Sequence, residues 1–94
     1  MRRSFKDHIR GFCNLKGYEW SDSEEDGRWC LRIDHYIKVF NSIHRKNWYV
    51  MVDNITGIQC DCAASEWDLM CDVIEHQMTE HLTKRAEREG RKYI

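Results

Sequence analysis

The residues from Trp29 to Phe40 follow a pattern of period two, with mainly apolar residues at the odd positions and mainly polar ones at the even positions. The odd positions carry Trp, Leu, Ile, His, Ile and Val, and the even positions carry Cys, Arg, Asp, Tyr, Lys and Phe. A period of two is typical of a β-strand with one covered face and one open face. We therefore predict one long strand over residues 28–40. Its open face carries Arg32, Asp34, Tyr36 and Lys38.

Shorter segments with the same alternation lie on both sides of this strand. They predict further short strands over residues 18–20, 48–52 and 58–62. The polar stretch 21–27 ends in Asp-Gly, a turn signature, so we expect a loop there. Residues 53–57 end in glycine and are expected to form the turn of a hairpin.

Helical periodicity marks the two ends of the chain. Ser4 is placed to cap a helix that runs to about Lys16, with Gly17 able to end it. The C-terminal helix is predicted from Ser65 to about Glu89, with one apolar stripe. The stripe consists of Trp67, Met70, Cys71, Ile74, Met78 and Leu82. The predicted fold class is α+β, a small antiparallel sheet of three to four strands flanked by an N-terminal helix and a long C-terminal helix, in the order α-β-β-β-α. We expect the C-terminal helix on one side of the sheet, and the N-terminal helix either in that layer or across the end of the sheet.

Length and composition restrict the class of protein. The 94 residues fit one domain over residues 1–94, and the formal net charge of −1 provides no overall attraction to nucleic acid or to a membrane. The first residues lack the apolar segment of a secretory signal, and no run approaches the roughly 20 apolar residues of a membrane span. Five cysteines without an export signal indicate reduced thiols in a cytoplasmic protein.

Four residues raise the alternative of a small zinc protein. They are Cys60, Cys62, Cys71 and His76. Their spacing matches none of the usual zinc-binding pairs, and the cysteine on the helix falls on the buried stripe. Burial as small apolar side chains is the more common role of free cysteine, so we expect no metal and no cofactor.

His35 is the one polar residue on the apolar side of the predicted strand. A histidine there could act as a general base, because its ordinary pKa is close to neutrality. A neutral core histidine with one hydrogen bond is the more common outcome. Asp34 points to the other face of a strand, so the two cannot form a dyad directly. The chain also has no nucleophile elbow and no glycine-rich phosphate loop, and we expect no enzymatic activity.

Nucleic-acid binding is a second alternative, because a helix–three strands–helix order is also that of the double-stranded-RNA-binding domain. Such domains carry a basic cluster at the start of the last helix. Residues 63–68 are acidic there, so we reject that family. The basic termini remain as a weaker candidate surface. They consist of Arg2, Arg3, Lys6 and Arg10 at one end and Lys84, Arg85, Arg88, Arg91 and Lys92 at the other.

The acidic stretch between Gly17 and Gly27 is the strongest candidate for binding. It contains five carboxylates and no base. Together with the open face of the predicted strand, it makes a partner-binding surface for a protein with a basic patch, because charge complementarity speeds association and tyrosine and arginine are favoured anchors. The predicted surface consists of Glu19, Trp20, Asp22, Glu24, Glu25, Asp26, Arg32 and Tyr36, with Phe40 in a row with the last two.

A small non-enzymatic protein that binds another protein is the function we expect. Small size, segregated charge and no catalytic constellation are typical of inhibitors and adaptors, including those of bacteriophages and other mobile elements, such as anti-CRISPR proteins. No motif assigns the chain to such a family. A homodimer is compatible with the many Trp and Tyr residues, and we expect no contact with membranes.

Overall fold

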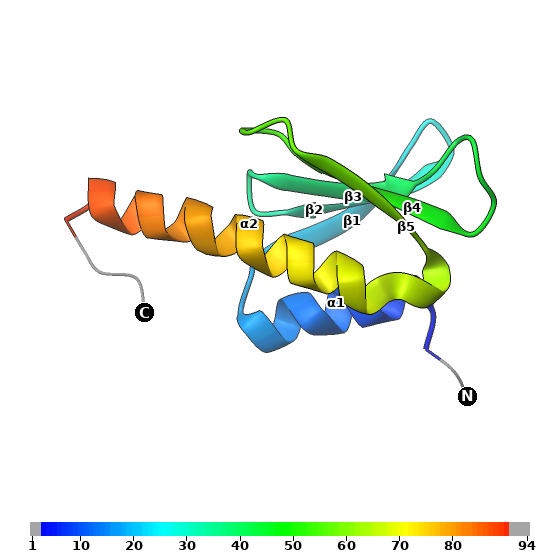
Figure 1. The fold of residues 1–94 in the computed structure, drawn as a ribbon, viewed down its shortest axis with the longest axis horizontal. Helices are drawn as coiled ribbons and strands as arrows, with labels where there is room; N and C mark the ends of the chain where they lie inside the picture. Colours follow the sequence, from blue (N-terminus) through cyan, green and yellow to red (C-terminus); the bar gives the residue numbers. More distant parts are fainter. Residues whose placement is uncertain (1–2, 91–94) are drawn as a thin grey trace.

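The structure is a computed structural model that describes residues 3–90. It is an α+β fold in which five antiparallel strands form one meander, in the order β1-β2-β3-β4-β5, between two helices (Figure 1). The elements are α1 (Phe5–Lys16), β1 (Trp20–Glu25), β2 (Arg28–Ile33), β3 (Ile37–Asn41), β4 (Trp48–Asp53), β5 (Gln59–Ala63), a 3-10 turn (Ala64–Glu66) and α2 (Trp67–Arg88). The class and the order of helices and strands are as predicted, but the sheet has five strands where three to four were expected.

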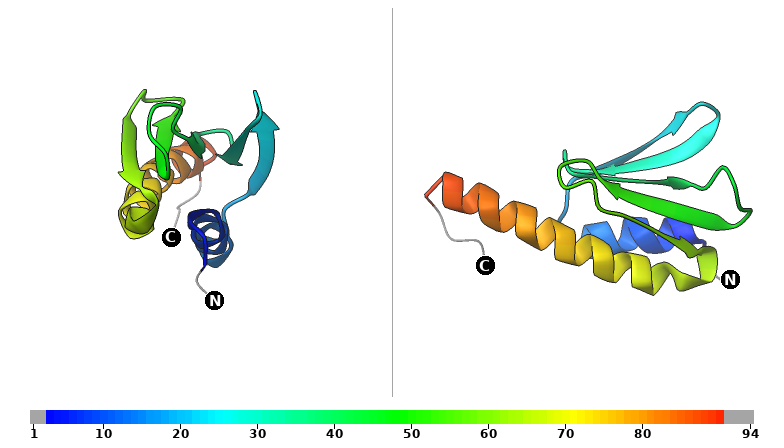
Figure 2. Two further views of the ribbon diagram at one scale, coloured as in Figure 1. Left: turned by 90° about the vertical axis from the view of Figure 1, so that its right-hand side faces the viewer. Right: turned by 45° about the horizontal axis from the view of Figure 1, so that its top comes forward.

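Both helices lie on the same face of the curved sheet, and the other face is open (Figure 2). The first helix therefore joins the layer of the second, which is one of the two placements left open by the sequence. The helices also contact each other directly. His8 stacks on Trp67 with ring centres 3.9 Å apart, and Lys16 pairs with Glu75 at 3.2 Å.

Both ends of α1 are determined by local interactions of residues that the sequence analysis identified. The Ser4 hydroxyl accepts a hydrogen bond from the Asp7 N–H at 3.2 Å, and Gly17 ends the helix with a φ of 75°. The start of α2 differs from the expectation, because residues 64–66 form a 3-10 turn first. The Glu66 carboxylate there accepts a hydrogen bond from the Ala63 N–H at 3.0 Å. None of the helices in the described part of the chain is both long enough and apolar enough to cross a membrane.

The predicted long strand over residues 28–40 is wrong, because it is a hairpin of β2 and β3. The chain reverses at residues 34–36, and Ile33 pairs with Ile37 across the turn. Paired residues lie on the same face of a sheet, and Ile33 and Ile37 are four positions apart. The alternation of period two therefore continues unchanged through the reversal. Asp34 begins the turn with a φ of 53° and accepts a hydrogen bond from the His35 N–H through its own carboxylate.

The predicted acidic loop over residues 21–27 is also wrong, since most of it is strand β1. Only Asp26 and Gly27 form the turn, both with positive φ, which is typical of a two-residue β-hairpin. β1 lies at the edge of the sheet and contributes no fully buried side chain. Tertiary pairing with β2 outweighs the low strand propensity of its Ser, Asp and Glu residues.

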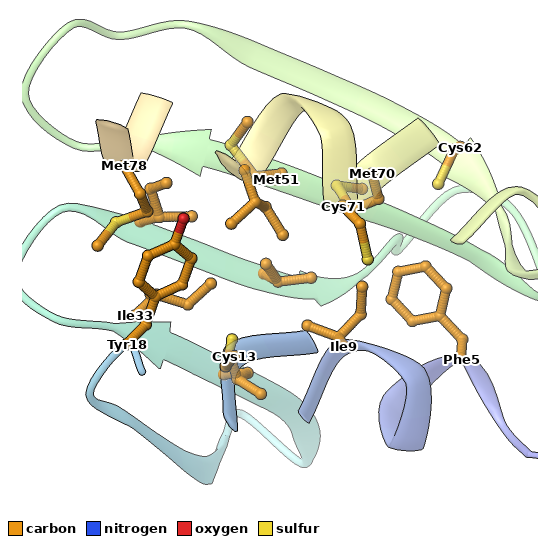
Figure 3. Packing of buried hydrophobic residues seen from close by; sticks show 14 of the residues in the cluster. Phe5, Ile9, Cys13, Tyr18, Ile33, Met51, Cys62, Met70, Cys71 and Met78 are labelled. Carbon is orange, nitrogen blue, oxygen red and sulfur yellow. The ribbon is translucent and has the colours of Figure 1, made fainter. Parts of the chain in front are cut away.

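The core fills the space between the helices and the covered face of the sheet (Figure 3). Its sulfur content is high, since three methionines and three cysteines belong to it. The core residues are Phe5, Ile9, Cys13, Tyr18, Trp29, Leu31, Ile33, Ile37, Val39, Met51, Cys62, Met70, Cys71, Ile74 and Met78. They come from both helices, from four strands and from the segment that leads into β1.

Candidate functional site

Asp22 of the acidic surface is exposed, but its carboxylate is already paired within the chain. Its carboxylate accepts a hydrogen bond from Arg10 Nε at 2.7 Å and one from Trp29 Nε1 at 3.2 Å. The hydrogen bonds from Arg10, and then from Trp29, keep the pKa of Asp22 below its ordinary value. This carboxylate therefore ties β1 to α1 and β2.

Glu25 is likewise engaged, on the open face of the sheet. It lies 2.5 Å from Lys38 Nζ and 2.7 Å from Arg32 Nη2. The hydrogen bonds from Lys38 and from Arg32 lower the pKa of Glu25 to about 2. Arg32 is thus solvent-exposed as predicted, but its charge is already paired across the hairpin.

Three acidic residues of the predicted surface remain exposed, without an ion pair within residues 3–90. They are Glu19, Glu24 and Asp26. They do not form one cluster, because Glu19 precedes β1 and the other two lie at its far end. At about 3.3 Å per residue, Glu19 is separated from Glu24 and Asp26 by roughly 17 Å or more.

The backbone edge of β1 is open. The Asp34 N–H donates to the Glu19 carbonyl at 2.8 Å, which marks these two residues as a hydrogen-bonded pair between the strands. In an antiparallel ladder such pairs alternate with pairs that are not hydrogen-bonded. The backbone groups of Trp20, Asp22 and Glu24 therefore point away from β2, and no strand of the described chain pairs with them.

Trp20 is half-buried, and its indole N–H donates to Asn14 Oδ1 at 2.8 Å. Its side chain belongs to the covered side of the sheet, since it faces Ile33 in the register. Trp20 therefore helps to fix the start of β1 on α1.

Tyr36 is not on the open face with Arg32, which corrects the predicted row of Arg32, Tyr36 and Phe40. It lies in the turn between β2 and β3, where strand alternation does not set the direction of a side chain. Its ring stacks on His81 of α2, with ring centres 4.4 Å apart and planes at 13°. The open face instead carries Lys38 opposite Arg32, beside Phe40.

A buried Asp53–His81 pair lies beside Tyr36, and the sequence analysis missed it. Asp53 ends β4, and its Oδ1 atom accepts hydrogen bonds from the N–H groups of Ile55 and Thr56 at 2.9 and 3.0 Å. Its Oδ2 atom lies 2.6 Å from His81 Nε2. Burial raises the pKa of Asp53, but the hydrogen bonds from the Thr56 backbone and from His81 more than offset this, and the net pKa is below the ordinary value. The carboxylate is therefore ionised and can only accept, so His81 Nε2 must carry the proton that they share.

Further contacts join this pair to the turn between β2 and β3. Arg85 Nη1 pairs with Asp34 Oδ2 at 3.2 Å, and the Arg85 guanidinium lies 5.9 Å from the centre of the Tyr36 ring. The Asn54 N–H donates to the Tyr36 carbonyl at 2.8 Å. Two hairpin turns at one end of the sheet are thus fastened to each other and to α2.

His35 takes no part in this cluster. Its side chain is 91% exposed, and its ring approaches the Asp34 carboxylate only at 3.9 Å. The prediction that it lies on the apolar side of a strand is wrong, because residues 34–36 are a turn. An exposed ring in water has no structural support for a role as general base.

The four residues of the zinc alternative do not form a ligand set. The Cys60 thiol lies 3.9 Å from the Met70 sulfur, while His76 is exposed and lies 3.4 Å from Glu80. Burial raises the pKa of both Cys62 and Cys71 to about 11, which keeps them as neutral thiols. Within residues 3–90, no group of three or more His, Cys, Asp or Glu side chains is arranged to hold a metal ion.

The sequence did contain a signal for the buried pair. His81 continues the spacing of Ile74 and Met78 along the buried stripe of α2. Asp53 falls on the same face of β4 as Met51, two residues earlier. Two polar residues at core positions of different elements predict a mutual contact, since buried polar groups need partners.

Arg2, Arg91 and Lys92 of the predicted basic termini lie outside the described residues.

In three comparisons with known proteins, no family model, no curated protein and no solved structure matched the chain.

Proposed function

We propose that this chain is a non-enzymatic protein of the inhibitor or adaptor type, which binds a basic surface of a partner protein through strand β1. One observation carries the proposal. β1 is an edge strand whose outer backbone groups pair with no other strand of the described chain. Two exposed carboxylates at its far end, Glu24 in the strand and Asp26 in the turn that follows, have no ion-pair partner there.

An open edge strand suits the addition of a strand from a partner. The backbone groups of Trp20, Asp22 and Glu24 offer a row of donors and acceptors, which supplies affinity in this mode of recognition. The carboxylates select a basic partner and speed its association. Charged residues along an edge strand discourage pairing between identical copies of the chain, so the carboxylates of β1 leave its edge selective for a basic partner.

The paired members of the predicted surface have a supporting role in this proposal. Asp22 holds β1 against Arg10 of α1, and Glu25 joins Arg32 and Lys38 across the hairpin. These contacts preorganise the edge, and a rigid edge loses less conformational entropy on binding. A surface that presents carboxylates along a strand could cover a basic site that normally holds nucleic acid, as inhibitors of phages and mobile elements do.

The test separates the charge from the backbone of the edge. Partners are captured from a lysate of the source cells with the native chain and then measured individually against purified variants. The double variant Glu24→Gln/Asp26→Asn removes two carboxylates. It places asparagine at the turn position 26, and asparagine tolerates the left-handed conformation that the turn requires. The matched control, Asp72→Asn/Glu80→Gln, removes two carboxylates from the exposed face of α2.

We expect the edge variant to weaken binding by about tenfold or more and to reduce its dependence on salt. The control should bind like the native chain. A further variant, Glu24→Pro, removes the outward N–H and should weaken binding beyond Glu24→Gln. Equal affinity of all variants for every captured partner would refute the role of β1.

A further inference from the structure

A groove lies at the opposite end of the molecule from the turn between β1 and β2. The last turns of α2 project beyond the sheet, on the side of the turn between β4 and β5 (Figure 1). Residues of both segments line the groove. Its volume is about 550 Å³. Its lining consists of Tyr36, Ile55, Thr56, His81, Lys84, Glu87 and Arg88.

Two cations stand on the helical side of this groove. Lys84 and Arg88 are one helical turn apart, and neither has a carboxylate partner among the residues that the structure describes. Arg85, between them, is paired with Asp34. Glu87 is the one carboxylate in the lining, so the groove has an excess of positive charge.

His81 adds a directed polar atom. The residue is 6% exposed, and its Nε2 atom is held by Asp53. Its Nδ1 atom has no hydrogen-bond partner within residues 3–90. The residue itself is part of the lining of the groove.

The opposite wall of the groove is apolar. Ile55, in the turn between β4 and β5, is 65% exposed and offers an apolar side chain to a ligand. Tyr36 contributes its half-buried ring. A ligand that fits both walls carries a negative charge at one end and an apolar body at the other.

We propose that this groove binds a small organic anion, with its phosphate or carboxylate between Lys84, Arg88 and His81 and its apolar part against Ile55 and Tyr36. The imidazole then lies between two acceptors, because Asp53 accepts from Nε2 and the bound anion accepts from Nδ1. This site is separate from β1 and does not depend on the function proposed for that strand.

Donation from both ring nitrogens requires the imidazolium form of His81, which a bound anion favours by accepting from Nδ1. The other charged or titratable groups around the imidazole are Asp53 from β4, Tyr36 from the preceding turn, and Lys84, Arg85, Glu87 and Arg88 from α2.

The experiment titrates the ¹⁵N-labelled chain with phenyl phosphate, benzoate and inorganic phosphate, and follows the amide and imidazole resonances. We expect phenyl phosphate or benzoate to bind saturably and to shift only the resonances of the groove residues. Its affinity should be at least about tenfold higher than that of inorganic phosphate. We expect the imidazole resonances of His81 to shift on binding, because the anion accepts a hydrogen bond from its Nδ1 atom.

Matched variants locate the site. Lys84→Gln/Arg88→Gln should weaken binding by about tenfold or more, because each charge-assisted hydrogen bond contributes strongly. Two controls should bind the probes like the native chain. Arg3→Gln/Lys46→Gln removes two exposed cations elsewhere, and Glu24→Gln/Asp26→Asn alters only β1. The proposal would be overturned if the resonance shifts did not saturate at probe concentrations up to about 10 mM, which is on the order of the weakest specific binding. Equal weakening by Arg3→Gln/Lys46→Gln would overturn it as well.

Discussion

The Asp53 carboxylate and the His81 imidazole meet at 2.6 Å, with their side chains 0% and 7% exposed. They join the end of β4 to a position about two turns before the end of α2, across 28 residues of sequence. The same carboxylate also accepts two backbone N–H groups of the turn that follows β4. One buried charge therefore determines both the shape of that turn and the position of the helix above it.

Replacing Asp53 by alanine should destabilise the fold strongly. The variant Asp53→Ala leaves the imidazole and two N–H groups without an acceptor, and breaking a buried pair in this way costs about 3–5 kcal/mol. The free energy of unfolding from urea denaturation measures the effect. Asp72→Ala, which truncates an exposed aspartate on α2, should change it by no more than about 0.5 kcal/mol. A loss from Asp53→Ala as small as that of the control would contradict the structural role of the pair.

The stability of the chain should fall at acidic pH because of the same carboxylate. The pKa of Asp53 is lower in the folded chain than its ordinary value of 3.8. Its ionised form is therefore favoured by folding, and this contribution is complete above the ordinary pKa and is lost as the pH falls through the folded-state pKa. Unfolding followed by circular dichroism at a series of pH values tests this. The conservative variant Asp53→Asn should lose part of the acid dependence, and an unchanged acid dependence would speak against Asp53 as its source.

Glu25 should titrate far below the usual range of a glutamate. Its hydrogen bonds with Lys38 and Arg32 lower its pKa to about 2. Carbon-13 resonances of the side-chain carboxyl, recorded across acidic pH, measure this value directly. Lys38→Gln should bring the pKa back toward 4.5, the ordinary value, whereas Lys46→Gln, on the exposed connection between β3 and β4, should leave it unchanged. A normal titration of Glu25 in the native chain would show that the hairpin is not clamped in this way.

The thiols should react slowly in the folded chain. Burial raises the pKa of Cys13 to about 12, and neutral buried thiols are poor nucleophiles. Cys60 is half-buried and is therefore expected to react first with a disulfide reagent at pH 8. The other thiols should react at the rate of unfolding. Cys60→Ser should remove the first phase, and a second thiol that reacts equally fast would contradict the burial described above.

The hairpin of β2 and β3 shows why some features could not be read from the sequence. Ile33 and Ile37 lie on one face whether the chain continues straight or reverses through three residues, so the alternation alone does not distinguish the two. Asp34 was the available signal, because aspartate tolerates a left-handed conformation and favours turns. The position of Tyr36 beside His81 then followed from the reversal, and with it the loss of the predicted row on the open face.

The acidic surface was predicted in composition but not in form. Five carboxylates between Gly17 and Gly27 are visible in the sequence, but their pairing is not. Asp22 meets Arg10 and Glu25 meets Lys38 only because distant segments pack together. Long-range pairs of this kind depend on register and helix placement, which no local pattern encodes.

The sequence by itself determined the two helices with the cap at Ser4 and the end at Gly17, the order of helices and strands, and the inward residues of β2 and β3. These features depend on contacts within a few residues or on periodicity, which are local properties of the chain. The tertiary structure alone decided the edge position of β1, the pairing of its carboxylates, and the contact between Asp53 and His81. Each of these joins residues from separate elements, so it exists only when the sheet has been ordered and the helices have been packed on it.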